Sequence, residues 1–250
     1  MSRPKGVKTQ GDRAGLELTA VLGPVRAGNA FEETVERLLT VIKLGVVGPG
    51  ERFPAERDLA VLLGISRITL REAIKALHQA GYVESRRGRF GGTFVTYTRP
   101  APSRSEVRRI AREDGDRIAD ALTFRMAVET GAAQVLAQSG GGYDTEVLLG
   151  RLASVNDAVP NDYRRMDTLF HLAIGELTGS SLLAAACADA RMRLNDLLNA
   201  IPVLQHNIDH TAAQHTAIVD AILARDAGRV QRAVSEHLEG TAALLRAFLT

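Results

Sequence analysis

Hydrophobic positions divide the chain into a short mixed part and a longer helical part. Up to residue 96, helical periodicity over 31–44 and over two shorter segments is followed by two runs that favour strands, Tyr82–Ser85 and Thr93–Thr96. After residue 105, apolar side chains recur at helical spacing with no convincing pair of strands. The spacing predicts helices near 115–139, 143–156, 161–178, 180–199, 208–225 and 227–249, with short connections as in an antiparallel bundle.

A linker separates these two parts. The stretch Tyr97–Arg104 has two prolines, few apolar residues and no periodicity, which is typical of a domain boundary. We therefore expect a first domain over 29–96, a linker over 97–105 and a helical domain over 106–250. Residues 1–28 lack the long apolar core of a secretory signal, and we expect them to form a mobile tail.

Local signals in the first domain indicate three helices followed by a hairpin. Pro54 suits the first turn of the second helix, and Gly64 suits its end. Ser66 can cap the third helix, because its hydroxyl can accept from free N–H groups of the first turn. Residues 86–92 form a basic, glycine-rich hairpin tip. This order of elements is that of a winged helix-turn-helix.

The third helix has an apolar face and a basic face. The apolar stripe that should face the core is Leu70, Ala73, Ile74 and Leu77. The basic stripe, about 120° away around the helix, is Arg67, Arg71, Lys75 and His78. Such a helix can pack on one side and present cations to phosphates or guanine edges on the other. The solvated face of an ordinary helix would look the same, so the inference of DNA binding depends on the neighbouring helix, turn and hairpin.

Charge and composition narrow the function further. Residues 1–100 contain 16 Lys and Arg against 10 Asp and Glu, a net charge of +6, whereas the rest of the chain is net −4. A polyanion should therefore meet only the first domain. The longest apolar runs are too short to cross a membrane, and the single cysteine, Cys187, excludes an intrachain disulfide and fits the cytoplasm.

The segment from Pro49 to Val95 resembles the DNA-binding domain of the GntR family of transcriptional regulators. It contains the elements PGERFPAER, GISRITLREA and GGTFV, and the match extends without a gap over the domain. The residues that the resemblance assigns to DNA contact are Arg57, Ser66, Arg67, Thr69 and Arg71, with Gly88, Gly91 and Gly92 at a wing tip in the minor groove. Glu56 is expected to order the second helix rather than touch DNA.

Four polar side chains of the second domain are expected to point inward from three helices. Asp167 and His171 are four residues apart beside an apolar stripe, and His215 and His237 each lie within one. A lone core histidine is usually a hydrogen-bonded structural residue. Four such groups together need partners, and three neutral imidazoles with one carboxylate suit a divalent ion such as Zn²⁺, Ni²⁺ or Mn²⁺.

These positions also carry a second resemblance. The helical part is similar to the FCD effector domain of the FadR subfamily of GntR regulators, through a D-x-x-F-H signature ending at His171, an H-x-x-I-x-x-A-I pattern from His215, and His237. The resemblance implies a divalent metal held by Asp167, His171, His215 and His237, with a carboxylate effector beside it. The sequence departs from the family at 179–181, where Gly-Ser-Ser stands in a stretch that often contains Asn.

Arg125 and Glu129 are four residues apart on an apolar stripe and should both face inward. One interpretation is a buried ion pair that joins two helices. The other is that Arg125 offers a bidentate site to an effector carboxylate. Cys187 is most simply a small core residue.

The sequence therefore predicts a mainly α protein with an N-terminal winged helix-turn-helix and a C-terminal all-α bundle. The function expected is a homodimeric cytoplasmic repressor that binds a pseudo-palindromic operator in double-stranded DNA under control of a small organic acid. Two alternatives are an architectural DNA-binding dimer with a structural polar core, and a metal-dependent hydrolase. The hydrolase is disfavoured because no further general base is evident beyond Glu129.

Overall fold

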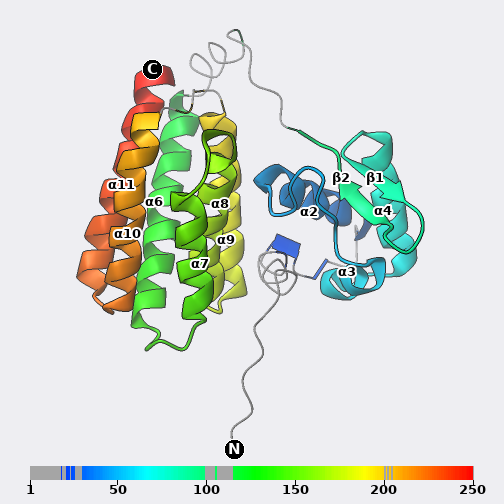
Figure 1. Cartoon of the computed structure of the whole chain (residues 1–250), viewed down its shortest axis with the longest axis horizontal. Coiled ribbons are helices and arrows are strands. Elements are labelled where there is room, and N and C mark those ends of the chain that lie inside the picture. Colours follow the sequence, from blue (N-terminus) through cyan, green and yellow to red (C-terminus); the bar gives the residue numbers. More distant parts are fainter. Residues whose placement is uncertain are drawn as a thin grey trace, which may run out of the picture. The chain divides into compact units, whose positions relative to one another are not determined.

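A computed structural model describes residues 18, 21, 22, 24, 25, 30–98, 105, 115–199, 201, 203 and 205–249. The chain divides near residue 97 into two compact units (Figure 1). The first unit is the smaller and combines helices with a hairpin, and the second consists of long helices. Among the described helices, none is long and apolar enough to span a membrane.

The first unit has the predicted order of three helices and a hairpin. Its elements are α2 (Ala30–Leu44), α3 (Glu56–Leu63), α4 (Arg67–Gln79), β1 (Val83–Arg86) and β2 (Gly92–Val95). The two strands are antiparallel, with Val83 opposite Val95 and Arg86 opposite Gly92. Each strand is displaced by one residue from its predicted range, because pairing in this register brings Val83 and Val95 together in the core.

Local capping explains where α3 and α4 begin and end. Gly64 ends α3 in the left-handed conformation with φ 65°, as predicted. The Ser66 hydroxyl accepts a hydrogen bond of 3.0 Å from the Thr69 backbone N–H, so Ser66 caps α4. Pro54 was expected in the first turn of α3, but it lies before the N-cap, Ala55. The predicted stripe of α4 is buried in the core of this unit.

The expectation of a mobile tail over 1–28 is wrong for the part of it that the structure describes. Leu18, Val21 and Leu22 are buried, because they are apolar side chains that gain by leaving water. The Val25 backbone N–H donates to the Leu63 carbonyl oxygen at 2.9 Å, which ties this segment to the end of α3. The remainder of 1–28 and most of the linker 97–105 lie outside the described residues.

The second unit is an all-helical bundle. Its helices are α6 (Gly115–Gln138), α7 (Thr145–Asn156), α8 (Pro160–Leu177), α9 (Ser181–Leu198), α10 (Gln205–Leu223) and α11 (Ala227–Leu249), all within a few residues of their predicted bounds. Helix α6 packs against α8, α9 and α11, and α10 packs against α11 (Figure 1). Phe170, Ile218 and Val234 belong to a hydrophobic core of buried residues, whereas Phe248 near the end of α11 is 43% exposed.

Glu176 near the end of α8 is a half-buried acid, and its ionisation makes stability depend on pH. Its Oε1 has no hydrogen-bond partner among the described residues. Burial raises the pKa of Glu176 from 4.5 to about 8, against the opposing charge of Arg151. Between these two values the folded chain holds a proton that the unfolded chain has released. The free energy of unfolding should therefore decrease as pH rises from about 4.5 to about 8.

We expect Glu176→Gln to remove this loss and to be more stable than wild type above pH 8 by about 1–2 kcal/mol. Thermal unfolding across the pH range measures the effect, and a gain of this size raises Tm by roughly 2–8 °C. Glu239→Gln on the exposed side of α11 is the matched control and should follow wild type. Parallel pH profiles for Glu176→Gln and wild type would contradict the assignment.

Candidate functional site

One face of α4 presents the basic side chains expected to meet DNA. Arg67 is the first residue of the helix and is exposed, as are Lys75 and His78 farther along it. Thr69 is half-buried, and its hydroxyl lies 2.8 Å from the Ser66 hydroxyl. Ser66 therefore already serves as a helix cap, and its assignment to DNA contact remains a prediction.

Two of the predicted DNA-contact arginines form ion pairs on the surface. Arg71 Nε donates to Glu56 Oε2 at 2.7 Å, which links α4 to the start of α3 and agrees with the structural role expected of Glu56. Arg57 Nε donates to Asp58 Oδ1 at 3.1 Å. Exposed pairs of this kind contribute little to stability, about 0–1 kcal/mol. DNA phosphates could therefore compete for both guanidinium groups.

The wing between β1 and β2 needs its glycines. A Cβ on Gly91 would lie 2.3 Å from the Arg86 carbonyl oxygen, and Gly88 and Gly92 have φ values of 99° and 146°, which disfavour other residues. Arg52 Nη1 donates to the Gly91 carbonyl oxygen at 3.2 Å and ties the tip to the preceding loop. The conformation of the tip therefore depends on these three glycines.

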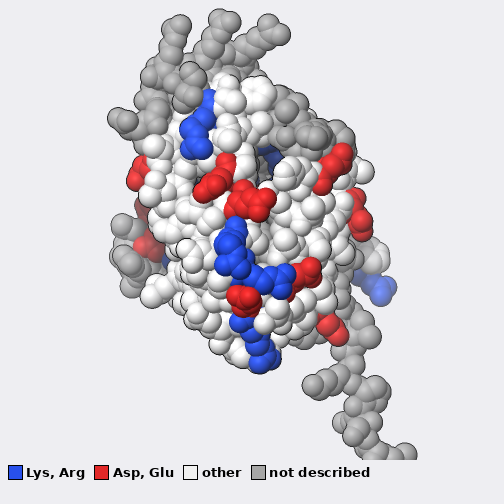
Figure 2. All heavy atoms as spheres, turned by 90° about the vertical axis from the view of Figure 1, so that its left-hand side faces the viewer, with Lys and Arg blue, Asp and Glu red and all other residues white. Residues whose placement is uncertain are grey.

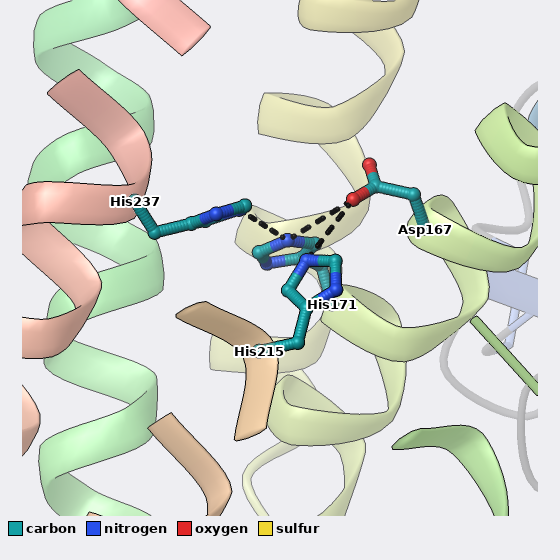
Figure 3. Close-up of side chains that lie close together, drawn as sticks. All are labelled: Asp167, His171, His215 and His237. Atoms are coloured by element: carbon teal, nitrogen blue, oxygen red, sulfur yellow. Dashed lines mark hydrogen bonds and ion pairs between the residues drawn. The ribbon is translucent and has the colours of Figure 1, made fainter. Parts of the chain in front are cut away.

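In the second unit, the four predicted metal ligands lie together. Asp167 and His171 come from α8, His215 from α10 and His237 from α11, and all four are buried. One ligand atom from each residue lies within 4.8 Å of the others. Figure 3 shows the three rings and the carboxylate pointing toward one another from three helices, with Asp167 and His171 on the same one. We refer to these four residues as the Asp/His cluster.

Distances within the Asp/His cluster fit a shared cation better than a closed hydrogen-bond network. His171 Nε2 lies 3.1 Å from His237 Nε2, a contact that is a hydrogen bond only when one of these two nitrogens carries a proton. His215 Nε2 lies 3.3 Å from Asp167 Oδ1 and makes no hydrogen bond of good geometry with any described residue. Buried polar atoms without partners are costly. A divalent ion would take the lone pairs of all four groups.

Electrostatics keep these groups in the protonation states that metal ligands need. Burial lowers the pKa of His171 and of His237, which favours neutral imidazoles. Burial acts to raise the pKa of the Asp167 carboxyl, but the charge of Arg191 together with the neighbouring His215 and His171 outweighs burial and holds the pKa well below its ordinary value. Near neutral pH, His171 and His237 therefore offer neutral nitrogens and Asp167 offers a carboxylate oxygen.

A layer of partners behind the cluster orients its members. Glu129 Oε2 lies 2.9 Å from His171 Nδ1, which leaves the Nε2 of that ring facing the cluster. Arg191 Nη2 donates to Asp167 Oδ2 and, at 3.3 Å, to the Thr168 hydroxyl. Gln214 Oε1 lies 3.3 Å from His237 Nδ1. Such partners fix the ring orientation and tautomer of ligating histidines.

Sequence reasoning missed Arg191, which is fully buried in α9. A signal was available, because Arg191 continues the buried stripe of Ala184, Cys187, Ala188, Leu194 and Asn195. Its charge made it look like a surface residue. Cys187 was interpreted correctly as a core residue, and burial raises the pKa of its thiol to about 12, so it stays protonated.

Arg125 and Glu129 both face inward, as predicted. Their ion pair, Nε to Oε1 at 3.1 Å, lies within α6 instead of joining two helices, because residues four apart share one face of a helix. Arg125 Nη1 is buried without a hydrogen-bond partner among the described residues. The same guanidinium lines a cavity of about 440 Å³ beside Asp167 and His237, which we call the α11 cavity.

Both units match known families. Residues 31–95 match the gntR family of bacterial regulatory proteins, and residues 107–240 match the FCD domain. The L-lactate dehydrogenase operon regulatory protein of Escherichia coli K12 is 29% identical over 225 residues, which cover 83% of each chain. The HTH-type transcriptional regulator RmpR of Mycobacterium gastri is 32% identical over 222 residues, covering 82% of this chain and 76% of RmpR.

A third relative is the HTH-type transcriptional repressor NanR of Escherichia coli K12, which is 26% identical over 235 residues. The match covers 90% of this chain and 88% of NanR. Among solved structures, the match with McbR/YncC of E. coli covers 87% of this chain and 97% of the McbR/YncC chain, with a TM-score of 0.47 and 19% identity. The matched families and the relatives named here are transcriptional regulators, not enzymes.

Proposed function

This chain belongs to the GntR family of bacterial regulatory proteins and carries an FCD domain, and we propose that a small carboxylate bound at a metal site controls the affinity of the protein for DNA. The convergence of Asp167, His171, His215 and His237 is the observation that carries the proposal. These four residues would hold the ion, which would supply a positive charge and an open coordination position for a ligand oxygen.

The residues around that position support binding of an anion. Arg125 is 2% exposed and lines the α11 cavity, and its Nη1 has no hydrogen-bond partner among the described residues, so the guanidinium has capacity to donate to a carboxylate. Thr211 and Gln214 line the same cavity with neutral polar groups. A dicationic ion and a buried guanidinium on one side of a cavity favour a ligand with a carboxylate at that end.

DNA binding would reside in the first unit. We infer that α4 enters a major groove through Arg67 and Arg71 and that the glycine-rich wing tip approaches the minor groove. On the helical unit, the face that includes α10 and α11 shows small groups of both charge signs and large uncharged areas (Figure 2). A homodimer in the cytoplasm that acts as a repressor on a pseudo-palindromic operator completes the proposal.

A second candidate is an architectural regulator with a structural polar core. The contact of 3.1 Å between His171 and His237 favours it, since one shared proton satisfies both rings without an ion. It leaves His215 Nε2 and Arg125 Nη1 unexplained. Metal analysis before and after chelation discriminates the two, because a structural polar core needs no stoichiometric metal.

The test of the proposed function is a DNA-binding titration with organic acids. Duplexes selected by the wild-type protein from random sequence would be titrated by fluorescence anisotropy, with lactate, citrate and longer monocarboxylates added in turn. At least one acid should change DNA affinity by about 5–150-fold, and removal of the metal by a chelator should abolish that change. If every acid leaves the affinity unchanged in metal-loaded protein, control of DNA binding by a metal-bound acid is wrong.

A further inference from the structure

The α11 cavity continues well beyond the Asp/His cluster. On α11 its wall includes His237, Gly240, Thr241, Leu244 and Ala247, which recur at helical spacing along one face. Ten residues separate His237 from Ala247, so this wall is about 15 Å long at a rise of 1.5 Å per residue. The volume of about 440 Å³ lies within the range of pockets for drug-sized ligands. A short hydroxy acid would fill only its inner end.

The chemistry of the wall changes along this length. The inner end contains Arg125, Asp167 and His237, and the side chain of Gln214 on α10 pairs with His237. Toward the other end α10 contributes Ile208 and α11 contributes Leu244. Both helices therefore change from polar to apolar in the same direction, away from the cluster.

The segment after α9 extends the apolar end. Leu198, Ile201 and Val203 line the cavity together with Ile208, and Ile201 and Ile208 are each only 5% exposed. Arg164 Nη2 donates to the Ile201 carbonyl oxygen at 2.7 Å, which fixes this segment against α8. Arg164 and His210 also line the cavity, and its outer part is thus a built surface that is mainly, not entirely, apolar.

Small residues on α11 keep the space open. A Cβ added at Gly240 would meet no heavy atom within 4 Å, although this position lies inside a helix and lines the cavity. Glycine inside a helix costs about 0.5–1 kcal/mol relative to alanine. The helix therefore accepts a less stable residue at the point where a side chain would occupy the cavity.

We propose that the effector of this protein is a monocarboxylic acid with an extended apolar body. Its carboxylate lies at the inner end beside Arg125, and its body lies along α11 toward Leu244 and Ala247. This inference rests on the proposed function, because the inner end is the metal-bound anion site. It distinguishes the ligand from a short hydroxy acid, which has no apolar body to fill the outer half.

The test is a series of straight-chain acids from propanoate to octanoate, together with lactate, titrated calorimetrically into metal-loaded protein. Affinity should increase about fourfold for each added methylene that enters the cavity. Gly240→Leu should weaken octanoate binding at least about tenfold by filling the space while leaving propanoate unchanged. Val203→Ser, at a partly exposed position of the outer end, should weaken octanoate several-fold without a change in folding.

The matched control is Gly131→Leu on α6, where an added Cβ also meets open space but does not line the cavity. It should leave the whole series unchanged. Metal-dependent binding of lactate and propanoate with no gain in affinity for longer acids would overturn the inference of an apolar body and would leave the proposed function unaffected. Absence of metal-dependent binding for every acid would overturn the proposed function itself. A chain-length gain that survives Gly240→Leu would show that the body binds elsewhere and would also overturn the inference.

Discussion

His215→Ala is expected to abolish stoichiometric metal binding and leave the helical unit folded. The His215 ring is buried, and its Nε2 faces Asp167 without a hydrogen bond of good geometry. Removing it therefore breaks no strong internal contact but takes one of four ligands from the ion. We expect the metal affinity to decrease by at least about 100-fold, measured by elemental analysis of the purified protein and by competition with a chromophoric chelator.

Asp167→Ala should have a different and larger effect. This substitution also removes the ligand, but it leaves the fully buried guanidinium of Arg191 with only the more distant carboxylate of Glu129, at 3.9 Å. Breaking a buried ion pair by removing one partner costs about 3–5 kcal/mol. We therefore expect metal-free Asp167→Ala to unfold at a lower temperature than metal-free His215→Ala.

The control for both variants is His210→Ala, which removes an exposed histidine of α10 that lies outside the Asp/His cluster. It should retain the metal content of wild type. Full metal occupancy in His215→Ala would show that the Asp/His cluster is not the metal site. Equal stability of the two cluster variants without metal would contradict the importance of the pair between Asp167 and Arg191.

Arg67→Ala and Arg71→Ala are expected to cause the largest losses of DNA binding. Both side chains are exposed on the basic face of α4, and Arg71 is held by a surface ion pair with Glu56 that DNA can replace. A good arginine contact to a base edge contributes about 1–3 kcal/mol, so each variant should bind selected duplexes roughly 5–150-fold more weakly. If Lys75 contacts only phosphate, Lys75→Ala should weaken binding to all DNA sequences alike and reduce the salt dependence of binding.

These affinities must be compared at one salt concentration, because DNA binding depends steeply on salt. The matched control is Arg229→Ala, which removes an exposed arginine from α11 in the helical unit. It should bind DNA as wild type does. Wild-type affinity in Arg67→Ala and Arg71→Ala would exclude α4 as the DNA-reading helix.

Much of the first unit could be predicted because its determinants are local. The Ser66 cap, the left-handed Gly64 and the buried stripe of α4 each depend on residues within a few positions of one another. The hairpin was expected within one residue on each strand. The burial of Leu18 and Leu22 was not foreseen, because a short apolar run does not reveal which surface will cover it.

The inward direction of the Asp/His cluster could also be predicted, since Asp167 and His171 are four residues apart and His215 and His237 lie on apolar stripes. That the ligand atoms lie within 4.8 Å of one another depends on how α8, α10 and α11 pack. Spacing within each helix does not determine the rotation of one helix against the next.

Periodicity, caps and motifs are local properties of the chain, and they were enough to predict the winged helix-turn-helix, the helical bundle and the identity of the four cluster residues. Three features depend on how the helices pack: Arg191 pairs with Asp167, Glu129 lies against the His171 ring, and the α11 cavity becomes mainly apolar away from the cluster. Each of these features brings together side chains from different helices. A buried charge is stable only beside its partner, and the packing of the bundle alone determines where that partner lies.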